Sequence, residues 1–376
     1  MLKSFRGDTI IYTKNGTSRI DNLSINDLIL DDNGDYVKIL NISKENLKAK
    51  MYKIKLHINT DNIFLTKKCK ILAIQDVPYD LKNNDIKKYI YNETRNSRPK
   101  YISVNDLTDF DYVGYPIPNF SDENHGNPPE FYRFFGLVVN SGFSNNFLLD
   151  INKNKDTLGF IKDYLTAKDI NYDEKCKDTQ VLISYSNDAF NITKFNYEYN
   201  NLNKESSIAL LKGLLELNIK DNNVSSKPFI YYKTNYKIYT YIFKFLLIKF
   251  GVLPSVFHYK DLHDNNISYY IIKIPFNSII KNILYSNDFD INNSRDYNDD
   301  DNIPDESGES NEIIDSANDV NKDDKYNYFV YNNIIWTKVK SVSTVPYNGL
   351  VYSLTTDKNI FTTDIGIINN IDNIIG

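Results

Sequence analysis

The 376-residue chain contains only two cysteines, Cys69 and Cys176, and no long uninterrupted apolar run. Two cysteines do not form a disulfide framework, so we expect an intracellular, reducing compartment and a fold held together by a hydrophobic core. The absence of an apolar run of about 18 residues argues against a membrane-spanning helix. The first residues, MLKSFRGDTI, lack the apolar centre of a signal peptide, so we expect no membrane partner.

Basic residues are nearly absent from one acidic segment. Residues 287–324 contain 14 acidic side chains and only two basic ones, Arg295 and Lys322. A segment of this composition cannot bury enough apolar surface to offset the entropy lost on ordering, so we predict that residues 287–325 form a disordered loop. The net charge is −5 for the whole chain and −12 for this segment, which leaves +7 for the remainder. This mild basic excess permits nucleic-acid binding without requiring it.

The two ends of the chain share a strand-like pattern. Residues 4–76 contain short stretches rich in β-branched and aromatic residues, such as DTIIYT and KMYKIKLHI, and KNG and DDNGD supply turns between them. The same character returns after the acidic segment, in YNYFVYNNIIWTKVKSVSTV, LVYSLTT and IFTTDIGII. We predict one all-β domain made of residues 1–127 and 326–376.

The middle of the chain has a helical pattern. PEFYRFFGLVVNSG has helical spacing and a glycine stop at Gly142, and SSIALLKGLLELNI begins on serines that suit a helix cap. TLGFIKDYLTAKDI, NYKIYTYIFKFLLIKFGV and FNSIIKNILYS add three more predicted helices, and TQVLISYS and ISYYIIKI add strands. An apolar helix followed by a strand and a helix occurs twice. We therefore predict an α+β domain over residues 128–286, with a pseudo-twofold repeat, inserted into the β domain.

Several stretches at the two ends resemble inteins and the related Hedgehog-type autoprocessing domains, which share the Hint fold. SFRGDTIIYTKNGTSRIDNLSINDLILDDNGDYVKI is similar to the opening intein block, and FLTKKCKILAI to the following threonine–histidine block. SVNDLTDFDYVGYPI resembles the stretch before the endonuclease insert, and GLVYSLTTDKNIFTTDIGIINN the closing block. In the middle, FFGLVVNSG and LKGLLELNI resemble the two motif helices of a dodecapeptide (LAGLIDADG) homing endonuclease, and YIFKFLLIKFGV a later helix of the second repeat.

The intein resemblance assigns a role to several residues. Ser4 matches the nucleophile that attacks the preceding carbonyl in an N-to-O acyl shift, although such a serine is also common at a strand edge. Thr66 matches the threonine of its block, and Cys69 stands where the family has histidine. A thiol is a poorer proton shuttle than imidazole at neutral pH, and the alternative is that Cys69 is a small buried residue in a strand.

The closing block departs from the family pattern. Asn369 and Asn370 match the terminal His-Asn pair, so the penultimate imidazole is missing, and Ile371 stands where the family has Cys, Ser or Thr. Asn370 retains the side chain that can cyclise and cleave the chain. Ile371 offers no nucleophile, so we expect that two flanking segments are not ligated.

The endonuclease resemblance implies a metal site that lacks its acids. The family uses one carboxylate at the foot of each motif helix to hold divalent cations such as Mg²⁺, which prefer charged oxygen ligands. The matching positions are Ser141, before Gly142, and Asn218. Glu216 matches a frequently acidic position that is not a metal ligand. We therefore expect no bound cofactor and no DNA cleavage, whereas Gly136 and Gly213 permit close packing of the two helices.

The sequence predicts a monomeric, degenerate intein-like element, in which protein splicing and DNA cleavage are impaired or lost. Its expected partners are double-stranded DNA and, if the chain is embedded, a host protein. The stretches YYKTNYK and KFNYEYN, taken as strand faces of the inserted domain, mix basic and aromatic residues as nucleic-acid surfaces do, although tyrosine is common throughout the chain. The alternatives are a non-catalytic DNA-binding or structural protein, and an active enzyme with relocated ligands.

Overall fold

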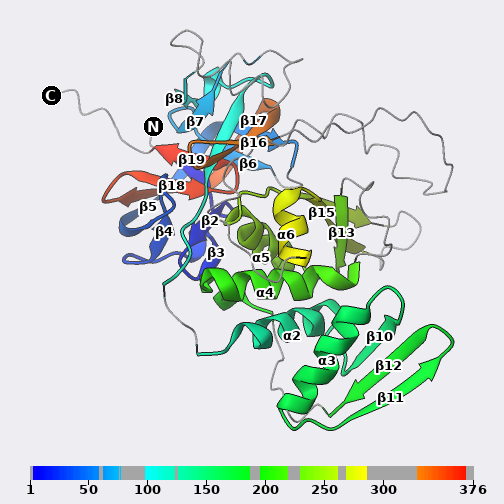
Figure 1. The fold of residues 1–376 in the computed structure, drawn as a ribbon. Helices are drawn as coiled ribbons and strands as arrows, with labels where there is room; N and C mark the ends of the chain where they lie inside the picture. The colour runs from blue at the N-terminus through cyan, green and yellow to red at the C-terminus, as the bar shows by residue number, and fades with distance from the viewer. Residues whose placement is uncertain are drawn as a thin grey trace, which may run out of the picture.

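A computed structural model describes residues 3–58, 62–75, 77, 98–122, 126–186, 195–218, 229–260, 268–285 and 328–369. The predicted disordered loop 287–325 and Asn370 lie outside these ranges. The architecture is mixed, with a large β body and a smaller part in which helices and strands alternate (Figure 1). Among the described residues, no helix combines the length and the apolar character needed to cross a membrane.

The β body contains strands from both ends of the chain, drawn in blue and in red in Figure 1. Within the described residues, thirteen strands join in one antiparallel system whose main path runs β1-β6-β5-β4-β2-β18-β19-β7-β9-β17-β16, with β3 on β2 and β8 on β7. Their bounds are β1 Phe5–Arg6, β2 Ile10–Thr13, β3 Gly16–Arg19, β4 Leu28–Leu30, β5 Tyr36–Leu56, β6 Ile63–Leu65, β7 Lys70–Ile74, β8 Lys100–Ser103, β9 Tyr112–Pro116, β16 Tyr328–Tyr331, β17 Ile334–Thr356, β18 Ile360–Thr363 and β19 Gly366–Asn369. Short 3₁₀ helices, η1 Ile20–Asn22 and η2 Val104–Asp106, join some of them.

Two long strands hold this body together. β5 and β17 pair antiparallel from Leu56 opposite Val339 to Ile39 opposite Thr356, with bulges near both ends. YVKILNI and KMYKIKLHI, which the sequence analysis treats as separate strands, are therefore parts of the single strand β5. The strands are longer than predicted because residues between the two stretches continue the ladder with β17 instead of turning.

The part between β9 and β16 repeats one succession of elements. A helix, a strand, a helix and two strands occur twice, and each set forms a three-stranded sheet, β10-β12-β11 and β13-β15-β14. The first set is α2 Pro129–Asn140, β10 Asn146–Asp150, α3 Lys155–Ala167, β11 Tyr172–Lys177 and β12 Gln180–Tyr185. The second set is α4 Lys204–Leu215, β13 Phe229–Thr234, α5 Lys237–Ile248, β14 Ser255–Lys260 and β15 Ser268–Pro275, followed by α6 Ser278–Tyr285. The 3₁₀ helices η4 Tyr197–Asn201 and η5 Glu216–Asn218 flank α4. In Figure 1, α2 and α4 lie side by side between the two sheets.

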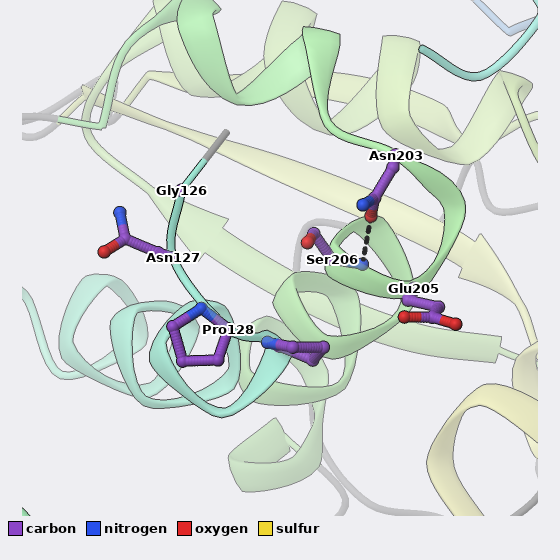
Figure 2. A pocket seen from close by; sticks show the side chains of 7 residues that line it. Gly126, Asn127, Pro128, Asn203, Glu205 and Ser206 are labelled. Atoms are coloured by element: carbon purple, nitrogen blue, oxygen red, sulfur yellow. Dashed lines mark hydrogen bonds between the residues drawn. The ribbon is translucent and has the colours of Figure 1, made fainter. Parts of the chain in front are cut away.

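The helix ends follow local sequence signals, with one correction. Gly142 has φ +73° and follows the last turn of α2, where its N–H donates to the Val139 carbonyl at 3.0 Å, so the predicted glycine stop is confirmed. The predicted serine cap of α4 is wrong. Asn203 caps this helix instead, because its Oδ1 accepts the Ser206 N–H at 2.9 Å, the contact drawn in Figure 2.

Helix α5 packs into the β body as well as into its own sheet. Phe245, Ile248 and Leu253 belong to the same core cluster as the buried residues of β1 to β9 and β17 to β19. The rings of Tyr12 and Phe245 stack with 5.6 Å between their centroids. The core of the β body therefore includes residues of the inserted part, which also has core clusters of its own, and α5 packs the inserted part against the strands near the chain ends.

Candidate functional site

Ser4 and Thr66 are joined by two reciprocal hydrogen bonds, one of which engages the N–H of the peptide bond before Ser4. The Ser4 N–H donates to Thr66 Oγ1 at 2.9 Å, and the Thr66 N–H donates to the Ser4 carbonyl at 3.0 Å. Thr66 follows β6, and Ser4 precedes β1, which pairs with β6 through Phe5 opposite Leu65. This strand pairing brings two residues 62 positions apart in the sequence into contact. Both residues are buried, so water does not compete for the contact.

The Ser4 hydroxyl is buried without a partner. Ser4 is 1% exposed, and within the described part of the chain its Oγ has no hydrogen-bond partner. An unpaired buried hydroxyl costs about 1–3 kcal/mol, so native structures rarely keep one without a reason. The unpaired Oγ sits one residue after the Lys3 carbonyl that an acyl shift would attack. Among the described residues, the hydroxyl that the sequence matches to the nucleophile is therefore not engaged by another group.

Cys69 joins the same cluster. Its Sγ donates to the Ser4 carbonyl at 3.7 Å and lies 3.6 Å from Thr66 Oγ1. Burial raises the pKa of the thiol to about 11, and the contacts with Thr66 and Ser4 lower it only in part. The thiol is thus protonated at neutral pH. The prediction that Cys69 is buried is confirmed. The prediction that it lies in a strand is wrong, because it lies in the turn before β7.

The last described residues reach the same turn. Asn369 ends β19 and pairs with Lys70, the neighbour of Cys69, while Ile368 pairs with Ile71. Its predicted companion Asn370 lies outside the described residues. The turn over residues 66–70 is therefore the place where the beginning and the end of the β body meet.

The second group of predicted residues lies on α2 and α4, which cross at two glycines. A Cβ built on Gly213 would lie 2.0 Å from the Arg133 carbonyl oxygen, and one on Gly136 would lie 2.6 Å from the Leu210 carbonyl oxygen. Neither position has room for a Cβ atom, so the two helix backbones contact each other directly. This close crossing places the C-terminal ends of both helices next to each other.

Polar but uncharged side chains occupy these helix ends. Asn218 Nδ2 donates to Asn140 Oδ1 at 3.3 Å, which links the ends directly, and to the Leu214 carbonyl at 3.1 Å. The Ser141 hydroxyl donates to the carbonyls of Val138 at 2.8 Å and Ser144 at 3.3 Å. Both positions that the sequence matches to metal-binding acids are therefore donors engaged with neighbouring oxygens.

Glu216 is a structural partner of the helix pair. Arg133 on α2 binds it through two contacts, Nη2 to Oε2 at 2.8 Å and Nε to Oε1 at 3.1 Å, and Thr157 Oγ1 donates to Oε2 at 3.2 Å. Arg133 also covers the Phe160 ring at 4.0 Å. The guanidinium group of Arg133 balances the negative charge of Glu216, and these contacts link α2, α3 and η5.

The residues at the helix ends do not fit a magnesium ion. Magnesium binds hard, preferably charged oxygens, whereas Asn218 and Ser141 present donors toward oxygens of the chain. The nearby Asp150 accepts the N–H groups of Asn152 at 2.9 Å and Lys153 at 3.2 Å, which close a turn. The side chains at the two helix ends therefore do not supply the charged oxygen ligands that a magnesium ion requires.

Supplying the two acids is expected to create a cation site. In the double variant Ser141→Asp/Asn218→Asp, carboxylates stand on both crossing helices, and Mn²⁺ at a hundredfold excess over its Kd stabilises the fold by about 2.7 kcal/mol. Thermal unfolding with and without Mn²⁺ measures this shift for the double variant, for Ser141→Asp alone and for the wild type. An equal shift of the wild type would contradict the account.

A pocket lies at the opposite, N-terminal ends of the same two helices. It encloses about 360 Å³ and is lined by residues from the segment before α2 and by Asn203, Glu205 and Ser206 of α4 (Figure 2). The capping contact of Asn203 occupies one of the helix N–H groups here. The pocket contains none of the residues that the sequence matches to catalysis.

The two predicted nucleic-acid stretches have different structures. YYKTNYK begins in β13, where Tyr231 is 52% exposed and Lys233 is also exposed. KFNYEYN is not a strand face, because it leads into the 3₁₀ helix η4 and its Phe195 belongs to the hydrophobic core. YYKTNYK therefore remains a candidate nucleic-acid surface, whereas KFNYEYN does not.

Two buried lysines, Lys244 in α5 and Lys249 directly after it, were not among the predicted site residues. Lys244 Nζ lies 2.5 Å from Asp364 Oδ1, and both side chains are buried. Lys249 Nζ donates to the Asn200 carbonyl at 2.5 Å, and burial lowers the pKa of Lys249 to about 8. The signal was present, since YIFKFLLIKF places two lysines inside an otherwise apolar helix, where a lysine is expected to have a specific partner.

No protein-family model matches the chain, and no curated protein matches it significantly. Among solved structures, the homing endonuclease I-DmoI is 14% identical over 41% of this chain and 92% of that chain, with a TM-score of 0.29. I-DmoI in complex with DNA and Ca is 15% identical over 41% of this chain and 86% of that chain, with a TM-score of 0.29. The gp41-1 intein is 20% identical over 27% of this chain and 77% of that chain, with a TM-score of 0.18. The structural neighbours thus include a homing endonuclease and an intein, each matched over part of the chain.

Proposed function

We propose that this chain is an intein-like element whose β body, a split Hint domain, activates the Lys3–Ser4 peptide bond for an N-to-O acyl shift. The observation that carries the proposal is the buried, unpaired Ser4 hydroxyl beside an amide that Thr66 holds. The inserted α+β domain, residues 128–286, retains the crossing helices of an endonuclease without its acids. Ligation of two flanking segments is lost, because Ile371 offers no nucleophile.

In the proposed step, Ser4 Oγ attacks the Lys3 carbonyl carbon. The carbon–oxygen bond forms, the carbon–nitrogen bond breaks, and the proton of the hydroxyl ends on the Ser4 nitrogen. Before the step, Thr66 Oγ1 accepts a hydrogen bond from the Ser4 N–H at 2.9 Å. As the carbon–nitrogen bond breaks, the Thr66 hydroxyl can donate a proton to the lone pair that forms on the Ser4 nitrogen. Thr66 Oγ1 takes up the proton that leaves Ser4 Oγ in exchange, so the net transfer is from Ser4 Oγ to the nitrogen and the Cys69 thiol, 3.6 Å from Thr66 Oγ1, stays protonated. The product is an ester, from which water or a thiol releases whatever polypeptide precedes Ser4.

Hydroxylamine, which cleaves esters faster than amides, tests the step on the full chain. We expect release of residues 1–3 as a hydroxamate, detected by mass spectrometry. Thr66→Val is expected to slow the release about 10- to 100-fold, since it removes a buried hydrogen bond worth about 1–3 kcal/mol. Thr17→Val is the matched control, because Thr17 is buried like Thr66 but its Oγ1, unlike that of Thr66, lacks a partner within the described residues. Equal release from both variants would contradict the role of Thr66.

A second function is nucleic-acid binding without cleavage, which the charge of one sheet favours. None of the residues in β13, β14 and β15 is acidic, and these strands carry the exposed Lys233 and Lys260 and the buried Lys273. Binding to a DNA duplex, with a log–log salt slope of about −0.9 for each phosphate neutralised, would support it. Binding that does not weaken as salt rises would contradict an interface based on these lysines.

A further inference from the structure

The strand registers define one outer face of the β13-β15-β14 sheet. Tyr231 lies opposite Lys273 and Lys233 opposite Ile271 between β13 and β15. Between β14 and β15, Phe257 lies opposite Ile271 and Tyr259 opposite Tyr269. The other face packs inward, since it contributes side chains to the core. The outer face, called the aromatic face below, consists of Phe229, Tyr231, Lys233, Ser255, Phe257, Tyr259, Tyr269, Ile271, Lys273 and Pro275.

Rings and ammonium groups are already ordered on the aromatic face. The rings of Tyr259 and Tyr269 stack with 4.7 Å between centroids, and Lys233 Nζ lies 3.8 Å from the Tyr269 centroid. Lys273 Nζ lies 3.9 Å from the Phe229 centroid, but Lys273 is only 3% exposed, so of the two lysines on this face Lys233 is the accessible one. Tyr231 is 52% exposed and Phe257 is 36% exposed. The face thus presents accessible aromatic surface with positive charge next to it.

The corresponding face of the other sheet has a different composition. Strands β10, β11 and β12 carry three acids, Asp150, Asp173 and Glu174, against two lysines, Lys175 and Lys177. Their outer face, which alternates with the buried residues of those strands, contains no aromatic side chain. We therefore expect a polyanion to be attracted more strongly to the β13-β15-β14 sheet than to the β10-β12-β11 sheet.

The side-chain types of the aromatic face fit unpaired bases. Base edges in a duplex are read mainly by Arg, Lys, Asn and Gln, and of these only Lys occurs on the aromatic face, which has no bidentate Arg, Asn or Gln group. Aromatic rings stack on bases only where the bases are unpaired and splayed out, at about 1–3 kcal/mol per base. Lysines beside the rings supply the phosphate contacts that such stacking surfaces use.

We propose that the aromatic face binds single-stranded nucleic acid by base stacking, with Tyr231 as a principal stacking residue and Lys233 near the phosphates. This inference rests on the second proposed function and narrows it from nucleic acid in general to unpaired strands. It is independent of the acyl shift at Ser4.

Fluorescence anisotropy of the full chain with labelled oligonucleotides of about 12 nucleotides tests the inference. The probes are oligothymidine, oligouridine and a DNA duplex of mixed sequence. We expect at least one single strand to bind more tightly than the duplex, and either sugar supports the inference. Tyr231→Ala is expected to weaken single-strand binding about 5- to 100-fold, whereas Tyr231→Phe keeps the ring and binds like the wild type.

Tyr285→Ala is the matched control, since Tyr285 is 60% exposed but lies on α6, outside the aromatic face. Circular dichroism and thermal unfolding establish that each variant folds. Duplex binding as tight as single-strand binding, or binding that Tyr231→Ala leaves unchanged, would overturn the inference and leave nucleic-acid binding standing. No binding to any of the three probes would overturn both.

Discussion

Asp364→Asn is expected to lower the free energy of unfolding by about 3–5 kcal/mol. The substitution replaces the carboxylate by a neutral amide and leaves the buried ammonium group of Lys244 without an opposite charge. An uncompensated buried charge is strongly destabilising. The pair is well enclosed, because Lys244 is 3% and Asp364 5% exposed at the side chain. Tyr12 also donates to Asp364 Oδ1 at 3.3 Å, and Tyr115 donates to the Asp364 carbonyl.

Denaturant unfolding with matched variants isolates this effect. Asp21→Asn breaks the exposed pair with Arg19, whose side chains are 51% and 23% exposed, and is expected to cost less than about 1 kcal/mol. Lys244→Met/Asp364→Leu removes both charges and is expected to recover most of the loss. A loss from Asp364→Asn no larger than that from Asp21→Asn would show that the pair does not anchor α5 to the turn between β18 and β19.

Gly213→Ala is expected to destabilise the protein by about 3 kcal/mol or more, at the upper end of overpacking effects. The added Cβ would meet the Arg133 carbonyl oxygen at 2.0 Å and the Leu137 nitrogen at 3.0 Å. Both are backbone atoms of α2, so relief requires the two helices to separate. Separation would also weaken the contact of Arg133 with Glu216.

Gly159→Ala provides the control on a neighbouring helix. A Cβ on Gly159 in α3 would meet nothing within 4 Å, so alanine should stabilise the helix by about 0.5–1 kcal/mol. The two substitutions are the same chemically and differ only in their surroundings. If urea unfolding gave the two variants similar stabilities, the close crossing of α2 and α4 would be wrong.

The helices were predictable because their signals are local. Apolar spacing and the glycine stop predicted α2, and similar spacing predicted α3 to α6 within a few residues. Strand β11, YDEKCK, was missed because five of its six residues are exposed, so it has no apolar alternation. It exists because β12 offers a partner strand, which composition alone does not reveal.

Contacts between distant segments were harder to predict. The sequence resemblance named Ser4, Thr66 and Cys69, but only strand pairing places the Ser4 amide 2.9 Å from Thr66 Oγ1 and leaves Ser4 Oγ unpaired. The contact of Lys244 with Asp364 joins residues 120 positions apart, and no periodicity connects them. The predicted domain limits follow composition, whereas α5 contributes to the core of both parts.

The most direct test of the account is the identity of the N-terminus after hydroxylamine treatment of the wild type and of Ser4→Ala. Intact-mass spectrometry and N-terminal sequencing identify the product. The account predicts a new N-terminus at Ser4 in the wild type and no cleavage at this bond in Ser4→Ala, which lacks the attacking oxygen. No cleavage of the wild type at Lys3–Ser4, or equal cleavage of both proteins there, would contradict it.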